Sequence, residues 1–115
     1  MIENIIIKKL DKAISGIRAY GETPEKKNEE YMLVEKTDSG LEDQIWQSVI
    51  EVQSISTKSK FRASWMNDQV IKVLRNIQHS SIASCELTTS YSSTKTETKE
   101  YRYKAVFEIT HYQED

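Results

Sequence analysis

The sequence predicts an α+β fold in which a mixed or antiparallel β-sheet is flanked by two α-helices. Two segments, residues 2–15 and 63–77, place apolar side chains at helical spacing. Residues 101–109 alternate between apolar and polar side chains, as a half-buried strand does. The expected order of elements is α-β-β-β-α-β-β, in a single domain over residues 1–115, because a chain of 115 residues has no room for a second core.

The N-terminal segment is expected to form an amphipathic helix over residues 2–15. Its apolar side chains share one stripe: Ile2, Ile6, Leu10, Ala13 and Ile14. Charged side chains fall opposite this stripe, and Gly16 follows it as a helix stop. The stripe is expected to face the sheet.

Three strands are expected next, at residues 17–20, 31–36 and 44–55. The polar segment 21–30 contains the only proline and is expected to be a loop, and Thr37-Asp-Ser-Gly40 is expected to be the turn before the third strand. Apolar side chains on both faces of the third strand predict cover on both sides: Trp46, Ile50 and Val52 on one face, and Ile45, Val49 and Ile55 on the other.

The second helix is expected after capping residues at Ser56–Lys60 and is expected to run to about Gln78. Its core stripe consists of Ala63, Met66, Val70, Val73, Leu74 and Ile77. Phe61 and Trp65 project to nearly the opposite side, near Asp68 and Lys72. Two interpretations stay open: these aromatics form a contact surface, or the helix begins later and Phe61 folds back onto the sheet edge.

Two strands, at residues 82–91 and 101–109, complete the sheet, and the hydrophilic segment 92–98 joins them. The inner face of the last strand is expected to hold Tyr101, Tyr103, Ala105, Phe107 and Ile109. On the preceding strand Cys85 shares a face with Ala83 and Leu87, which favours a buried core thiol.

The composition and the motifs favour a protein without catalytic chemistry. Sixteen basic and eighteen acidic residues give a net charge of −2, which provides no electrostatic reason for tight nucleic-acid binding. The single cysteine and the lack of a signal peptide favour synthesis in a reducing cytoplasm, and no segment approaches the ~20 apolar residues of a membrane span. His79 and His111 have no cysteine or carboxylate at metal-ligand spacing. We therefore expect no catalytic, cofactor-binding or metal-binding residues.

One pattern loosely resembles the acidic motif of metal-dependent nucleases. Asp43 precedes Glu51-Val-Gln53 on a strand, but glutamine stands where those enzymes place a lysine to help activate water. Alternating polar residues on an exposed strand face would give the same residues at these positions.

Several segments together resemble a known family. They are the amphipathic N-terminal helix, Ile17-Arg-Ala-Tyr20, Tyr31-Met-Leu-Val-Glu-Lys-Thr37, Ile50-Glu-Val-Gln-Ser54 before a capped helix, and the final Tyr-x-Tyr-x-Ala-Val-Phe-x-Ile-x-His-Tyr strand. In this order they resemble the small tail-terminator (tail-completion, head–tail joining) proteins of long-tailed bacteriophages and prophages. These segments are patterns, not invariant motifs, and they cover nearly the whole chain.

The resemblance implies a non-enzymatic virion protein, made in the bacterial cytoplasm and placed at the head–tail joint. Its subunits would form a hexameric ring that ends tail-tube polymerisation and offers a docking face to the head. Its partners would be other copies of itself, the tail tube protein and a head completion or connector protein, with no cofactor and no membrane. DNA would pass through the ring without being read.

Ring closure needs heterologous interfaces, in which one patch of each subunit meets a different patch of the next. The candidate interface residues lie in three segments: Phe61, Trp65, Asp68 and Lys72; Glu25, Lys26 and Lys27; and Thr94, Lys95 and Glu97. Two other functions remain open, a stand-alone binding or regulatory module with a ferredoxin-like sheet and a small metal-dependent nuclease.

Overall fold

The computed structural model of the chain describes residues 2–94 and 96–112, and it confirms the α+β class and the order of elements. The elements are α1 (Ile2–Ala13), β1 (Arg18–Tyr20), β2 (Glu30–Glu42), β3 (Ile45–Ser56), α2 (Lys60–Arg75), β4 (Ile82–Ser92), the short 3-10 helix η1 (Thr96–Thr98) and β5 (Tyr101–His111).

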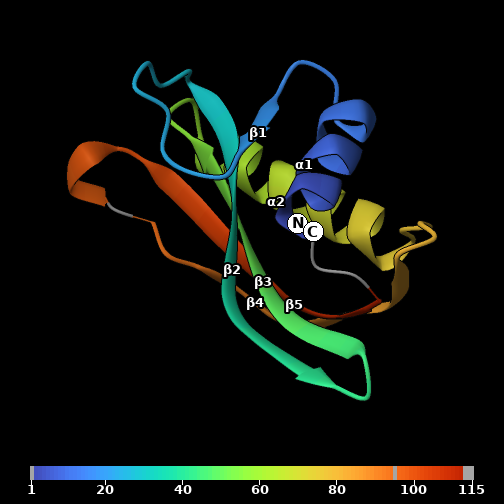
Figure 1. Ribbon diagram of the computed structural model, residues 1–115. Helices are drawn as coiled ribbons and strands as arrows, with labels where there is room; N and C mark the ends of the chain where they lie inside the picture. The colour runs from blue at the N-terminus through green and yellow to red at the C-terminus, as the bar shows by residue number, and fades with distance from the viewer. Residues whose placement is uncertain (1, 95, 113–115) are drawn as a thin grey trace.

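The described strands form one mixed sheet in the order β1-β2-β3-β5-β4. The short strand β1 runs parallel to β2, and every other neighbouring pair is antiparallel. Both helices cover the same face of this sheet, so its other face has no helix on it (Figure 1). Element order and sheet differ from the β-α-β-β-α-β plan of a ferredoxin-like domain.

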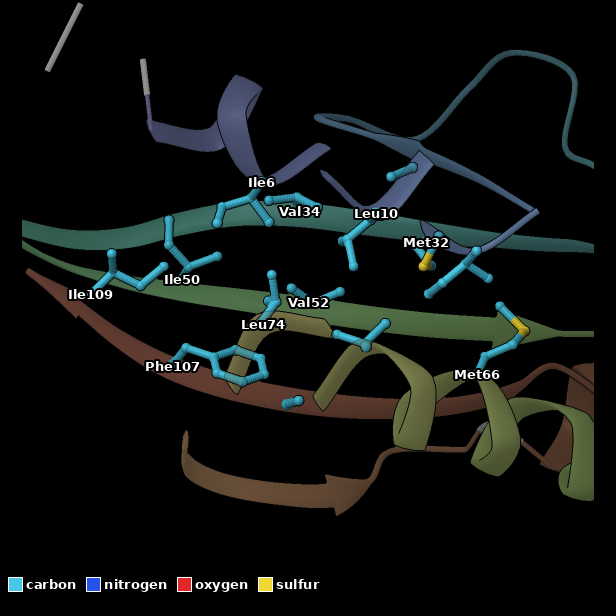
Figure 2. Close-up of a cluster of buried hydrophobic side chains, with 14 of the residues drawn as sticks. Ile6, Leu10, Met32, Val34, Ile50, Val52, Met66, Leu74, Phe107 and Ile109 are labelled. Carbon is cyan, nitrogen blue, oxygen red and sulfur yellow. The ribbon is translucent and has the colours of Figure 1, made fainter. Parts of the chain in front are cut away.

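The core lies between the two helices and the covered face of the sheet (Figure 2). Ile6 and Leu10 point from α1 toward Val34 and Met32 of β2, while Leu74 of α2 lies against the central strands (Figure 2). Three residues of β5 are buried here, as their alternation predicts: Ala105, Phe107 and Ile109. The same burial confirms which face of the last strand points inward.

Both helices end earlier than the sequence predicts. The first helix ends at Ala13, which is exposed, and Ile14 is buried in the turn that follows. The second is capped by Ser59, whose hydroxyl accepts a hydrogen bond from the backbone N–H of Arg62 at 3.1 Å. It ends at Arg75, because the chain turns at the C-cap residue Asn76, so the predicted continuation to Gln78 is wrong.

The predicted turn at residues 37–40 is also wrong, because β2 continues through it to Glu42. One extra residue, Thr37, is accommodated as a bulge between Lys36 and Asp38, and Gly40 simply remains in the strand. The turn lies at Asp43 and Gln44, whose φ angles are 52° and 65°. Two consecutive residues of positive φ match the right-handed twist of a hairpin.

Cover on both faces of β3 is confirmed for only part of the strand. Toward its C-terminal end Ile55 is fully buried on the face without helices, whereas Ile45 at the other end is 39% exposed. On β4 a bulge between Ile82 and Ser84 turns Ala83 into solvent. Cys85 packs against the core, but on this edge strand it is only partly buried, so the expected buried thiol is confirmed only in part.

Candidate assembly surfaces

The first candidate surface is the stripe on α2 that points away from the core. The helix begins before Phe61, whose side chain is 75% exposed, so the interpretation in which Phe61 folds back onto the sheet edge is wrong. Asp68 and Lys72 are exposed on the same stripe. Trp65 differs from them: it is partly buried, packs against the core, and carries the Arg62 guanidinium 4.6 Å from its ring centre.

The Arg62 guanidinium also fixes the loop that precedes β2. Its Nε donates to Glu30 Oε2 at 2.8 Å and its Nη2 to Glu30 Oε1 at 2.9 Å, a bidentate pair. This pair holds the pKa of Glu30 below its usual 4.5, against the opposing effect of burial, and the hydroxyl of Ser56 adds a hydrogen bond at 3.1 Å. The end of the 22–30 loop is thereby tied to the start of α2.

The two candidate loops lie at this same end of the sheet. Glu25, Lys26 and Lys27 are exposed on the loop between β1 and β2. In the 92–98 connection, Thr94 accepts a hydrogen bond from the backbone N–H of Arg102 at 3.3 Å, and Glu97 is exposed. Lys95 lies outside the described residues. The strand after this connection starts at Tyr101, which lies opposite Ser56, and the Ser56 hydroxyl is bonded to Glu30 at the end of the other loop. All three predicted segments therefore lie at the same end of the sheet (Figure 1, upper left).

A further exposed surface, which the sequence did not predict, is the tip of the β2–β3 hairpin at the other end of the sheet (Figure 1, lower right). Leu41 is 56% exposed and Ile45 39% exposed. With Gly40, Glu42, Asp43 and Gln47 they line a shallow hollow of ≈ 350 Å³. With the turn expected at residues 37–40, the sequence does not predict a tip at residues 41–45, and residues 37–42 carry no polar-apolar alternation that would extend the strand.

The face of the sheet without helices carries mostly polar and charged side chains. Glu35 lies directly opposite Glu51, and Glu86 directly opposite Glu108. Lys104 lies 3.7 Å from Glu51 and offsets one of these charges. Like charges placed directly opposite each other destabilise a sheet, so the Glu86–Glu108 pair costs this sheet some stability.

A buried polar cluster lies at the base of the hairpin tip. His111 is fully buried, its Nε2 lies 2.7 Å from Ser48 Oγ, and Trp46 stacks against it with ring centres 6.4 Å apart. Ser48 Oγ in turn lies 3.0 Å from Ser39 Oγ. Although serine and histidine also meet in hydrolases, both Ser48 and His111 are 0% exposed, so no substrate reaches them.

The residues of the nuclease-like pattern are not brought together. Asp43 occupies the hairpin turn, and Glu51 lies eight residues along β3, which is about 26 Å at strand rise. Gln53 is bonded to the Arg102 guanidinium. Within residues 2–94 and 96–112, no three histidine, cysteine or acidic side chains are grouped closely enough to hold a metal ion. Burial raises the pKa of Cys85 to about 11, which leaves its thiol protonated and weakly nucleophilic at neutral pH.

The chain matches no known protein family and no curated protein. It is similar in structure to a chain from a solved structure described as the virion of a native gene transfer agent particle, with a TM-score of 0.61 and 10% sequence identity. The match covers 95% of this chain and 85% of that chain. At this identity the similarity establishes a shared fold. None of the helices in the described ranges has the length and apolarity that a membrane span requires.

Proposed function

We propose that this protein is a virion structural protein that forms a ring at the end of a phage or prophage tail tube, where it ends tube polymerisation and joins the tail to the head. The observation that carries the proposal is the structural similarity to a chain of a gene transfer agent virion, which spans 95% of this chain. A match over nearly the full length of both chains favours a whole subunit of the same kind over a shared fragment.

The distribution of exposed groups supports ring assembly. A ring needs two different patches on each subunit, and the exposed aromatic of α2 and the exposed apolar hairpin tip lie at opposite ends of the molecule. Neither patch belongs to the hydrophobic core, because Phe61, Leu41 and Ile45 are not among the residues that form the core cluster. The expected ring is a hexamer, as in the family that the sequence resembles.

The charge on the helix-free face supports passage of DNA without binding. If this face lines the channel, its exposed glutamates (Glu35, Glu86 and Glu108) present negative charge to the phosphate backbone, while Lys104 offsets Glu51. Tight binding of DNA requires the opposite, an array of lysine and arginine that releases counterions. A conduit with this surface lets DNA slide instead of holding it.

The test is native mass spectrometry over a wide range of protein concentration, with negative-stain electron microscopy of the same samples. We expect rings, with six subunits, that grow in as the concentration rises. A strict dimer at every concentration would contradict the proposal and favour a stand-alone binding module. DNA retained by the rings at physiological salt would contradict the conduit role separately, without affecting ring formation.

A further inference from the structure

Two exposed surfaces of the molecule differ in form: one has a projecting aromatic side chain and the other a shallow hollow. At one end Phe61 projects from the first turn of α2 with 75% of its side chain exposed. At the other end the hairpin tip, defined here as residues 38–47, holds a shallow hollow of ≈ 350 Å³. Ile45 lies in its lining on the same face as Glu42, which is directly opposite Ile45 in the hairpin. An exposed phenyl ring gains from an apolar contact, and Ile45 offers one in a lining that also contains Glu42, Asp43 and Gln47.

The two surfaces cannot meet within one molecule. The twelve residues of β3 separate them, a distance of about 40 Å at strand rise. Figure 1 shows the hairpin tip and the start of α2 at opposite ends of the sheet. Phe61 can therefore enter only the hollow of another copy. When that copy passes the contact on to a third subunit and does not return it, the contact is heterologous, and it closes into a ring where the rotation between neighbours allows closure.

The two surfaces match in charge. The hairpin tip contains Asp38, Glu42 and Asp43 and no basic residue. The first turn of α2 has no acidic residue, although the positive end of a helix dipole favours negative charge there. Arg62 is engaged by Glu30, and in the described part of the chain Lys60 makes no ion pair. At the helix start, Lys58 and Arg62 are paired with Glu29 and Glu30, which leaves Lys60 as the exposed positive charge that can face the acidic hairpin of another copy.

We propose that the start of α2 in one subunit docks onto the hairpin tip of the next copy of this chain, with Phe61 in the hollow and Lys60 beside Glu42 and Asp43. This inference rests on the proposed function, because it names the interface from which the ring is built. It also gives the ring a direction, since every subunit offers its hairpin to one neighbour and its helix to the other.

Cysteine cross-linking tests the pairing of the two patches. Glu42→Cys and Lys60→Cys are made separately in a Cys85→Ser background, mixed in equal amounts and oxidised mildly, with one chain isotopically labelled. Because a disulfide needs Cα atoms within about 7 Å, a 42–60 bond cannot form inside one chain. We expect mixed dimers joined by a disulfide between positions 42 and 60. With both cysteines in one chain, we expect a series of cross-linked oligomers whose largest member has the number of subunits in the ring.

Charge exchange provides an independent measurement with uncrosslinked protein. Lys60→Glu and Glu42→Lys should each lower ring formation about tenfold, and combining them in one chain should restore most of it, because the swapped charges again face each other. Lys8→Glu, at an exposed position on α1, is the matched control and should leave the ring unchanged. Lys60→Glu should not unfold the subunit, since an acidic residue suits a helix start.

The outcomes separate this inference from the function on which it rests. Rings that form normally while no 42–60 bond appears would overturn the docking and leave the proposed function standing. Homodimers joined 42–42 or 60–60 would overturn it as well, because they indicate a two-fold contact. Protein that neither cross-links nor forms rings at any concentration would overturn both.

Discussion

Truncating the two aromatics of α2 should have opposite consequences, although both lie on the same stripe. Phe61 is 75% exposed and touches little of its own subunit, so Phe61→Ala should change the free energy of unfolding of the monomer by no more than about 0.5 kcal/mol. Trp65 packs against the core and lies beneath the Arg62 guanidinium. Fully buried tryptophans cost about 3–5 kcal/mol when cut to alanine, so a partly buried one should cost about 2 kcal/mol.

The assay measures the two effects separately. Urea unfolding of dilute protein, where the subunit is monomeric, gives the free energy of unfolding. Thermal unfolding of the same samples should show a fall in Tm of roughly 8 °C for Trp65→Ala, which corresponds to about 2 kcal/mol. Native mass spectrometry at high concentration gives the ring fraction, which Phe61→Ala should reduce and Tyr91→Ala, another exposed aromatic, should not. If Phe61→Ala destabilises the monomer as much as Trp65→Ala does, the assignment of Phe61 to a surface role is wrong.

Two further predictions concern the fold of the subunit. The hydroxyl of Tyr31 is buried without a hydrogen-bond partner in the described part of the chain. Tyr31→Phe should therefore leave the free energy of unfolding unchanged or raise it by about 1 kcal/mol. A loss above about 1 kcal/mol on urea unfolding would mean that the oxygen does accept or donate a hydrogen bond. The pKa of Glu30 is lowered in the fold, chiefly by Arg62, so its contribution to stability is present above its unfolded pKa and is lost as the pH falls through the lowered folded pKa. Arg62→Met should therefore flatten the loss of stability between neutral pH and pH values below 4.5, and an unchanged acid profile would refute this account.

The periodic segments of the fold could be predicted because a single physical pattern dominates each of them. The alternation of β5 and the stripes of α1 and α2 identify the core faces, since burial of apolar surface contributes more to folding than any other interaction. The ends of these patterns are less reliable: Ala13 is exposed, and Tyr101 and Tyr103 are only partly buried. Element ends follow weaker, local effects. Thr37–Gly40 has the composition of a turn, yet hairpin register and one bulge carry it into β2, and the turn falls on Asp43 and Gln44.

Candidate surfaces were less predictable because exposure of a side chain depends on the tertiary neighbours that could cover it. Helical spacing places Phe61 and Trp65 together, but only the fold shows that Trp65 reaches the core while Phe61 does not. The hairpin tip could not be predicted, because its position depends on the turn at Asp43 and Gln44, which the sequence places elsewhere. The link between Arg62 and Glu30 joins residues 32 positions apart, and nothing local in the sequence indicates it.

The small size of the proposed contact determines how the ring should assemble. One phenyl ring buries about 150–250 Å² and stable pairs of proteins bury about 1,200–2,000 Å², so Phe61 and its flanking charges cannot hold two copies together for long. In a closed ring every subunit makes two such contacts, and the last contact forms between ends already held close, at a high effective concentration. Assembly should therefore pass from monomer to ring without stable dimers or trimers. A subunit of this kind stays single in dilute solution and closes into a ring as its concentration rises.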